Sequence, residues 1–228
     1  MNQRVTRAII LSRTDYGEAD RIITLLTPDY GKVTLLAKGV RKVKSKLAGG
    51  IELFSVSEIT FIKGRGEVGT LVSTRLVKHY EHIVSDLDRT MLAYELLKRL
   101  NKVTESEVEE EYFALLQGAL EALNDLSVSL DLIRFWFDAQ LLRLGGQGPN
   151  LQTDEHGSPL SPEQQYTFDF ERMGFMAAPH GQFDAQHIKF LRLAFAGHSA
   201  LALAKVQGGT KLAGECTPML HHLMQLAF

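Results

Sequence analysis

The spacing of hydrophobic residues changes near residue 85, and this change constrains the fold more than any other feature of the chain. Before it, short runs of β-branched and apolar residues are separated by glycine-rich turns, a pattern typical of strands. The predicted strands cover about 5–11, 21–27, 32–38, 52–62 and 70–77. Pro28–Gly31 predicts a hairpin turn between the second and third. Five such strands fit a small barrel of the OB type, and an SH3-like barrel would give the same pattern.

After residue 85, apolar residues recur at intervals of three and four, which predicts helices. These helices cover about 85–100, 105–123, 130–144, 183–195, 199–205 and 217–228. Pro218 suits the first turn of the last helix. The sequence therefore predicts an α+β chain in two domains. A five-stranded OB-type β-barrel over 1–80 is followed by an all-α domain over 81–228, with an irregular insert at about 146–183.

Charge is distributed unevenly between the two predicted domains. Residues 1–80 carry 14 Lys and Arg against 7 Asp and Glu, whereas residues 81–228 carry 11 against 20. This asymmetry indicates that the first domain meets a polyanion. The densest basic run is Lys38–Lys46, in which five of nine residues are basic. A loop of this kind suits contact with a phosphate backbone; the alternative is a solvated loop that serves solubility.

Several function classes find no support in the sequence. The only cysteine, Cys216, excludes an internal disulfide. No apolar run approaches ~18 residues, and Met1–Val5 has no apolar signal core, so we expect a cytosolic location. The histidines show no hydrolytic or metal-binding spacing, and there is neither a P-loop nor a nucleophile elbow. We therefore expect a non-enzymatic protein without a cofactor.

Several segments of the first domain resemble the bacterial recombination mediator family RecO. The segment Arg13–Leu25 resembles the N-terminal signature of that family. Tyr30–Lys32, Ala37–Gly49 and Gly64–Leu71 continue the likeness. In the second half it is reduced to the chain length, the helical pattern and Gly148–Leu151.

The resemblance implies an N-terminal OB domain, a helical C-terminal domain and a role in DNA repair and recombination at the nucleoid. It also implies binding of single- and double-stranded DNA and annealing of complementary strands. The implied protein partners are RecR and the acidic C-terminal tail of single-stranded DNA-binding protein. Together these activities would help load a recombinase onto DNA coated by single-strand-binding protein.

The chain departs from many members of that family at a zinc site. Those members carry two Cys-x-x-Cys pairs, whereas residues 153–157 and 174–180 contain no cysteine here. Asp154, His156 and His180 leave at most three ligands, and structural zinc nearly always has four. We expect a metal-free segment that forms a short hairpin packed by phenylalanines. These phenylalanines are Phe168, Phe170 and Phe175.

The candidate binding residues follow from charge. For DNA they are Lys38, Arg41, Lys42, Lys44 and Lys46, with Arg13, Arg65 and Arg75 as second choices. Candidate base-stacking rings are Tyr16, Tyr30, Phe54, Phe61 and Tyr80, of which Phe61 has the strand parity of a core residue.

A tail that ends in an apolar residue and a free carboxylate needs an apolar pocket beside a cation. Arg134 and Lys189 are the predicted flanks of such a pocket, and ordinary snorkelling at a helix edge is the alternative. At the level of the whole chain, the alternative to a DNA-binding mediator is a protein–protein adaptor whose basic loop engages an acidic partner.

Overall fold

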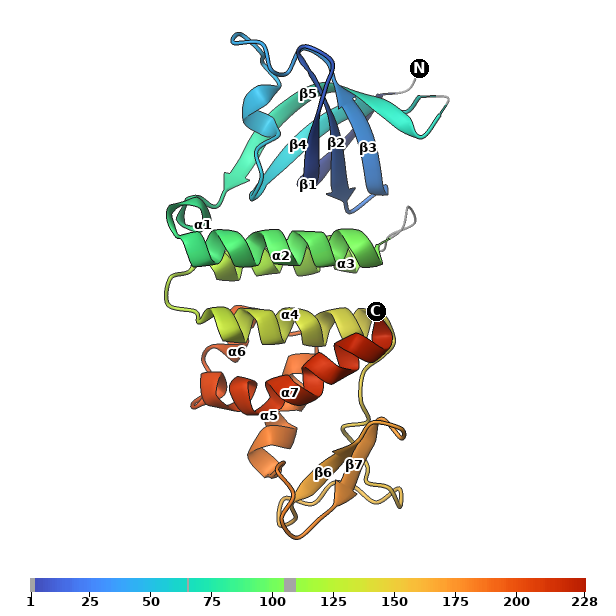
Figure 1. Ribbon diagram of the computed structural model, residues 1–228, viewed down its shortest axis with the longest axis vertical. Helices are drawn as coiled ribbons and strands as arrows, with labels where there is room; N and C mark the ends of the chain where they lie inside the picture. The colour runs from blue at the N-terminus through green and yellow to red at the C-terminus, as the bar shows by residue number, and fades with distance from the viewer. Residues whose placement is uncertain (1–2, 65, 105–109) are drawn as a thin grey trace. The chain divides into compact units, whose positions relative to one another are not determined.

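The computed structural model describes residues 3–64, 66–104 and 110–228 (Figure 1). The chain forms two compact units, residues 1–125 and residues 126–228. Among the described residues, none of the helices combines the length and apolar character needed to cross a membrane.

The first unit contains a closed five-stranded barrel. Its strands are β1 (Gln3–Tyr16), β2 (Asp20–Thr27), β3 (Gly31–Ala37), β4 (Ser55–Ile62) and β5 (Val68–His79). The order around the barrel is β1-β2-β3-β5-β4, and β4 closes it by pairing with β1. The β3–β5 pair is parallel and all the others are antiparallel. The five predicted strands and the OB-type barrel are confirmed.

Alternation along the strands fills the barrel with apolar side chains. Every second residue of a strand faces inward, so Ile23 and Leu25 of β2 share the core with Leu35 and Ala37 of β3. Ile59 and Phe61 of β4 join them, as the parity of Phe61 predicted. The turn between β2 and β3 holds Gly31 at φ +61°, a conformation that glycine adopts without strain.

Three helices belong to the same compact unit as the barrel. They are α1 (Glu81–Ser85), α2 (Leu87–Val103) and α3 (Glu110–Asn124). Asp86 caps α2 by accepting the backbone N–H of Arg89 at 3.0 Å. The short α1 was not predicted. The helix predicted over 105–123 corresponds to α3, and its predicted first residues, 105–109, lie outside the described residues.

At the opposite end of α2, Lys32 of β3 connects the barrel to the helix. Its ammonium group donates to the carbonyl oxygens of Asn101 and Thr104 at 3.1 and 2.6 Å. These are C-terminal carbonyls, where a cation also complements the helix dipole. The compact units divide after residue 125 rather than where strands give way to helices, so the domain boundary at residue 80 stays a prediction.

The second unit is helical with one small sheet. Its helices are α4 (Leu130–Leu144), α5 (Ala185–Phe195), α6 (Ala200–Leu203) and α7 (Gly209–Ala227). Phe135 of α4 stacks on Phe190 of α5 with ring centroids 5.4 Å apart. The indole N–H of Trp136 donates to the carbonyl oxygen of His198 at 2.6 Å.

The last helix begins eight residues earlier than predicted. Gly208 is in the left-handed region at φ +72° and precedes the first turn, so Pro218 lies inside α7 rather than at its start. An interior proline costs roughly 3 kcal/mol of helix stability. Burial of Leu212, Ala213 and Cys216 along one face of α7 offsets that cost.

The insert is more ordered than the prediction of an irregular segment implied. Strands β6 (Tyr166–Asp169) and β7 (Gly174–Ala177) form an antiparallel hairpin. Phe168 contacts both Phe170 and Phe175 edge to face, with centroids 5.0 and 5.1 Å apart. The predicted short hairpin with phenylalanine packing is therefore what these residues form.

Candidate nucleic-acid interface

The basic loop, defined here as residues 38–46, follows β3 and is held at both ends. Val40 and, beyond the loop, Ile51 are buried in the barrel core. The N–H of Gly39 donates to the Asp20 carboxylate at 2.7 Å, and the N–H of Arg41 donates to the carbonyl of Ala19 at 2.9 Å. These bonds fix the loop against the β1–β2 hairpin.

A 3-10 turn over Ala48–Gly50 holds the far side of this connection. A Cβ on Gly50 would lie 2.3 Å from the side chain of Thr74, so only glycine lets the turn approach β5 this closely. The Thr74 hydroxyl in turn donates to the carbonyl of Leu47 at 3.2 Å.

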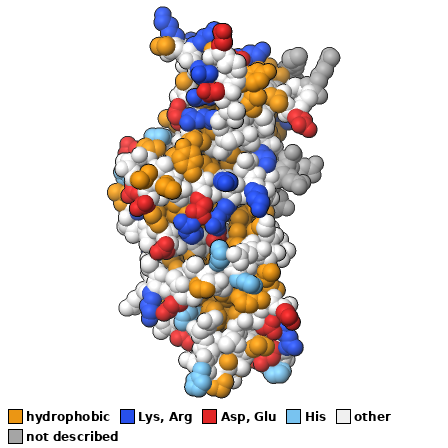
Figure 2. Space-filling model, viewed as in Figure 1, with side chains coloured by type: hydrophobic (Ala, Val, Ile, Leu, Met, Phe, Trp, Pro, Cys, Tyr) orange, Lys and Arg blue, Asp and Glu red, His pale blue; other side chains and the backbone are white. Residues whose placement is uncertain are grey.

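Four lysines of the loop present their ammonium groups to solvent. Lys38, Lys42, Lys44 and Lys46 are exposed, and none forms an ion pair within the described part of the chain. Between two of them, Val43 is fully exposed, which is unusual for an apolar residue at a loop tip. Figure 2 shows Lys and Arg side chains gathered at the end of the barrel where this loop lies.

Arg41 differs from these lysines because it is paired. Its Nε lies 3.5 Å from the carboxylate of Asp15, which also accepts a hydrogen bond from Arg21 at 2.8 Å. The Arg21 bond, together with the charges of Arg41 and Arg13, lowers the pKa of the Asp15 carboxyl from its usual value. Asp15 is therefore ionised at neutral pH and partly neutralises Arg41.

The two secondary candidates that the structure describes, Arg13 and Arg75, are both held in ion pairs. Arg13 pairs with Glu52 at 3.0 Å and donates to the carbonyl of Ile51 at 3.2 Å, so it braces the connection after the basic loop. Arg75 of β5 pairs across the sheet with Glu58 of β4 at 3.2 Å. Arg65 lies outside the described residues.

Exposure separates the aromatic candidates. Phe54, Phe61 and Tyr80 are buried, and burial raises the pKa of Tyr80 above its usual value. Tyr30 is half-buried, whereas Tyr16 is 55% exposed at the end of β1. Tyr16 precedes Gly17 and Ala19, whose carbonyls face Arg41, so it adjoins the basic loop. Tyr16 is therefore the candidate ring most open to a base, and the exposure of these rings could not be determined from the sequence.

In the second unit, Lys189 lies beside a pocket of about 160 Å³. Its apolar lining includes Leu160, Pro162 and Ile188, and Arg192 is a second cation in it. Arg134 lies on α4 and is not among the described residues that line this pocket. Arg192 was not among the residues predicted for this site. Its guanidinium group also donates to the carbonyl of Leu151 at 2.8 Å.

In the segment where the family resemblance implied a zinc site, the carboxylates of Asp154 and Glu155 are bonded to the backbone. Asp154 accepts the backbone N–H groups of His156 and Ser158, both at 2.9 Å, so its carboxylate closes a turn. Glu155 accepts the N–H of Ala177 at 3.2 Å. In the described ranges, no three His, Cys, Asp or Glu side chains form a group able to hold a metal ion.

These features define a class of protein: one with an OB-type barrel that carries an exposed basic loop at one end and is followed along the chain by helices. Two family models match the chain. One, described as "Recombination protein O N terminal", matches residues 1–80, and the other, "Recombination protein O C terminal", matches residues 84–188. The chain belongs to the recombination protein O (RecO) family, as its sequence motifs indicated.

Individual relatives agree with this assignment. A DNA repair protein RecO from Dehalococcoides mccartyi is 36% identical over 148 residues, which cover 64% of this chain and 58% of the relative. One from Halalkalibacterium halodurans is 30% identical over 193 residues, covering 81% and 74%. One from Syntrophus aciditrophicus is 31% identical over 180 residues, covering 76% and 69%. The matched region thus spans between 58% and 74% of these relatives' lengths.

Proposed function

We propose that this chain is a DNA-binding recombination mediator in DNA repair that acts without covalent chemistry. The observation that carries the proposal is the set of four exposed lysines on the basic loop, which form no ion pair with any residue that the structure describes. Membership of the RecO family and the relatives' shared name, DNA repair protein RecO, support the same role. On this proposal the protein works in the cytoplasm on nucleoid DNA, both single- and double-stranded.

Annealing requires two strands to approach despite the repulsion between their phosphates. The principal contacts are Lys38, Arg41, Lys42, Lys44 and Lys46, with Arg13, Arg65 and Arg75 as secondary ones. Each neutralised phosphate releases counterions, which favours binding at low salt. Lowered repulsion would let complementary strands pair and would help a recombinase load onto DNA coated by single-strand-binding protein.

The test is the salt dependence of binding to a labelled single-stranded oligonucleotide, followed by fluorescence anisotropy. Five phosphate contacts predict a slope of log affinity against log salt of about −3.5, or roughly a hundredfold loss between 50 and 200 mM. The Lys42→Glu/Lys44→Glu variant should lose most of this binding. Lys98→Glu/Lys205→Glu removes two exposed lysines outside the loop and should bind nearly normally. Absence of wild-type binding at 50 mM salt contradicts the proposal.

Two protein partners complete the proposed function: RecR and the C-terminal tail of single-stranded DNA-binding protein. For the tail we propose a receptor flanked by Arg134 and Lys189. The apolar pocket beside Lys189 supports that flank alone, because a terminal carboxylate favours a cation next to an apolar cavity. Arg134→Ala and Lys189→Ala should each weaken binding of a tail peptide, measured by calorimetry. If both variants bind as well as wild type, the assignment is wrong.

A protein–protein adaptor is the second candidate function. The observation that favours it is a row of exposed apolar side chains on α1 and α2, formed by Val84, Leu87, Met91 and Tyr94. Leu87, Met91 and Tyr94 are spaced so that they share one face of α2, which suits docking of a protein. Capture of the partner from nuclease-treated extract, with no oligonucleotide binding, would favour the adaptor over the mediator.

A further inference from the structure

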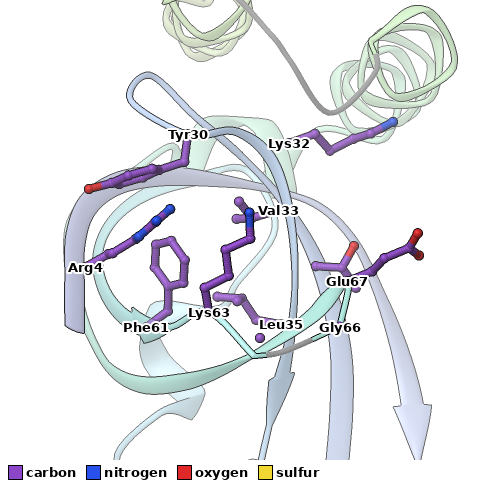
Figure 3. Close-up of a pocket in the computed structure, with 11 residues that line it drawn as sticks. Arg4, Tyr30, Lys32, Val33, Leu35, Phe61, Lys63, Gly66 and Glu67 are labelled. Atoms are coloured by element: carbon purple, nitrogen blue, oxygen red, sulfur yellow. The ribbon is translucent and has the colours of Figure 1, made fainter. Parts of the chain in front are cut away.

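A second candidate site lies at the end of the barrel opposite the basic loop. It is a cavity of about 540 Å³, within the range of about 300–1,000 Å³ usual for ligand sites. It opens between the first residues of β1 and β3, the end of β4 and the start of β5 (Figure 3). The basic loop follows the other end of β3, on the order of 20 Å away.

Two aromatic rings form one wall of the cavity. Tyr30 and Phe61 meet edge to face, with centroids 5.5 Å apart at 85°. Phe61 is buried in the barrel core and Tyr30 is half-buried, so Phe61 fixes the position of Tyr30, and Tyr30 is the ring exposed to the cavity. The floor is aliphatic, formed by Val33 and Leu35 of β3.

Cations accompany this wall. The guanidinium of Arg4 lies 4.8 Å from the centre of the Tyr30 ring. Figure 3 shows Lys63 extending from the end of β4 into the opening, whereas Lys32 points away toward the helices and Glu67 points outward. Lys32 is already bonded to the end of α2. The charge inside the cavity is therefore positive and comes from Arg4 and Lys63.

Gly69 of β5 leaves room for the close packing beside the cavity. A Cβ on Gly69 would lie 2.8 Å from both the Ile62 carbonyl oxygen and the Leu35 side chain. A side chain there would push β5 from β4 and move Leu35 into the cavity.

We propose that this cavity binds one nucleotide of a single DNA strand. The base packs against Tyr30, which Phe61 supports edge to face, and the phosphate lies between Arg4 and Lys63. Rings and cations side by side suit a nucleotide because a base offers a flat π face and its phosphate an anion. The inference rests on the proposed DNA-binding function and gives the barrel a second DNA contact separate from the basic loop.

A peptide with a terminal carboxylate also combines an apolar group with an anion, but it fits this cavity less well. A DNA phosphodiester and a carboxylate each carry one negative charge, so the rings make the difference: an aliphatic side chain offers no flat π face to the Tyr30–Phe61 pair. A single apolar side chain would also leave much of a cavity of about 540 Å³ empty. The peptide is accordingly one outcome of the test, and one that overturns the proposal.

Photocrosslinking with an oligonucleotide that carries 5-iododeoxyuridine locates stacked bases directly. Illumination of the complex followed by mass spectrometry should give an adduct on Tyr30. Adducts confined to Tyr16 or to the second unit overturn the proposal while leaving DNA binding intact. Absence of both binding and adducts refutes the proposed function together with the inference. The proposal is also overturned if two results occur together: a peptide with a terminal carboxylate occupies the cavity, and substitution of Arg4 and Lys63 leaves the affinity for the oligonucleotide unchanged.

Variants measure the energetic share of the cavity. Arg4→Gln/Lys63→Gln should make the salt slope shallower by about 0.7, the share of the one phosphate that these two cations hold. Lys98→Gln, which removes an exposed lysine of α2, should leave it unchanged. Tyr30→Leu retains packing on Phe61 and loses the ring, so we expect about fivefold or greater weakening with an unaltered salt slope. Unchanged affinity in folded Tyr30→Leu and Arg4→Gln/Lys63→Gln proteins, checked by circular dichroism, refutes the site.

Discussion

At the scale of single residues, Arg41 differs from the lysines of its loop because Asp15 lies beside it. The sequence placed Arg41 correctly in a basic run, but the pairing depends on the β1–β2 hairpin folding back against the loop. Such a contact between residues 26 positions apart is not encoded in local spacing. The lysines therefore carry most of the unbalanced charge, and Arg41 is partly occupied in positioning the loop.

Asp15→Asn should strengthen binding of single-stranded DNA a few-fold at low salt, because it removes a negative charge beside the loop. Screening should abolish the gain at high salt. The lowered pKa of Asp15 means that wild type keeps this charge at neutral pH and loses it only as pH falls through that lowered value. Affinities of variant and wild type should then converge in acid, as measured by anisotropy.

Glu18→Gln is the control for this effect. It removes one charge from the same hairpin without an ion pair to Arg41 among the described residues. An equal gain from Glu18→Gln would mean that net charge alone, rather than the release of Arg41, explains the result.

Cys216 should be unreactive in the folded protein. Burial, with Glu215 and Asp184 nearby, raises the pKa of its thiol to about 12, so almost no thiolate is present at pH 8. A colourimetric disulfide reagent should label it only as α7 unfolds in denaturant. Rapid labelling of native protein would show that α7 opens far more readily than its buried face implies.

At the scale of elements, the sequence located most strands and helices but not the start of α7. Pro218 is a good first-turn residue, and Gly208 with Gly209 looks like a loop. The helix runs through Pro218 because its buried face packs against α4 and α5, a tertiary effect that no local pattern contains. The short α1 was not predicted for a different reason: its five residues are too few to show a helical periodicity.

Hydrogen bonds from side chains to the backbone help to hold the insert together. Glu155→Ala should remove the bond to the N–H of Ala177 and speed its hydrogen exchange about fivefold or more, given that such a bond contributes roughly 1–2 kcal/mol. Glu171→Ala, on the turn of the same hairpin, should have little effect. A chelator should leave exchange unchanged; an effect of chelator equal to that of Glu155→Ala would indicate a bound metal.

At the scale of the whole molecule, the chain divides into compact units 1–125 and 126–228. The change of periodicity near residue 85 marks a change of element type, and helices α1–α3 nevertheless share a unit with the barrel. Long-range hydrogen bonds, such as those from Lys32 to the end of α2, help to hold these helices and the barrel in one unit. Bonds of this kind join residues about 70 positions apart and leave no trace in local sequence.

Binding of DNA should stabilise the two units unequally. The single tryptophan, Trp136, lies in the second unit, so its fluorescence reports unfolding there. Because a ligand stabilises what it binds, a single-stranded oligonucleotide should raise the unfolding temperature of the barrel seen by circular dichroism. The Trp136 transition should stay in place. An equal shift of both would show that the units unfold together or that DNA also contacts the second.

The exposed tip of the basic loop bears on the heat of binding. When a nucleic-acid strand covers Val43, apolar surface leaves water, which gives a negative heat-capacity change that lysines alone do not produce. Counterion release vanishes in concentrated salt, but dehydration of an isopropyl group does not. The affinity that survives near molar salt should therefore be carried by apolar contacts, and Val43, as the apolar residue at the tip of an otherwise cationic loop, should supply a measurable part of it.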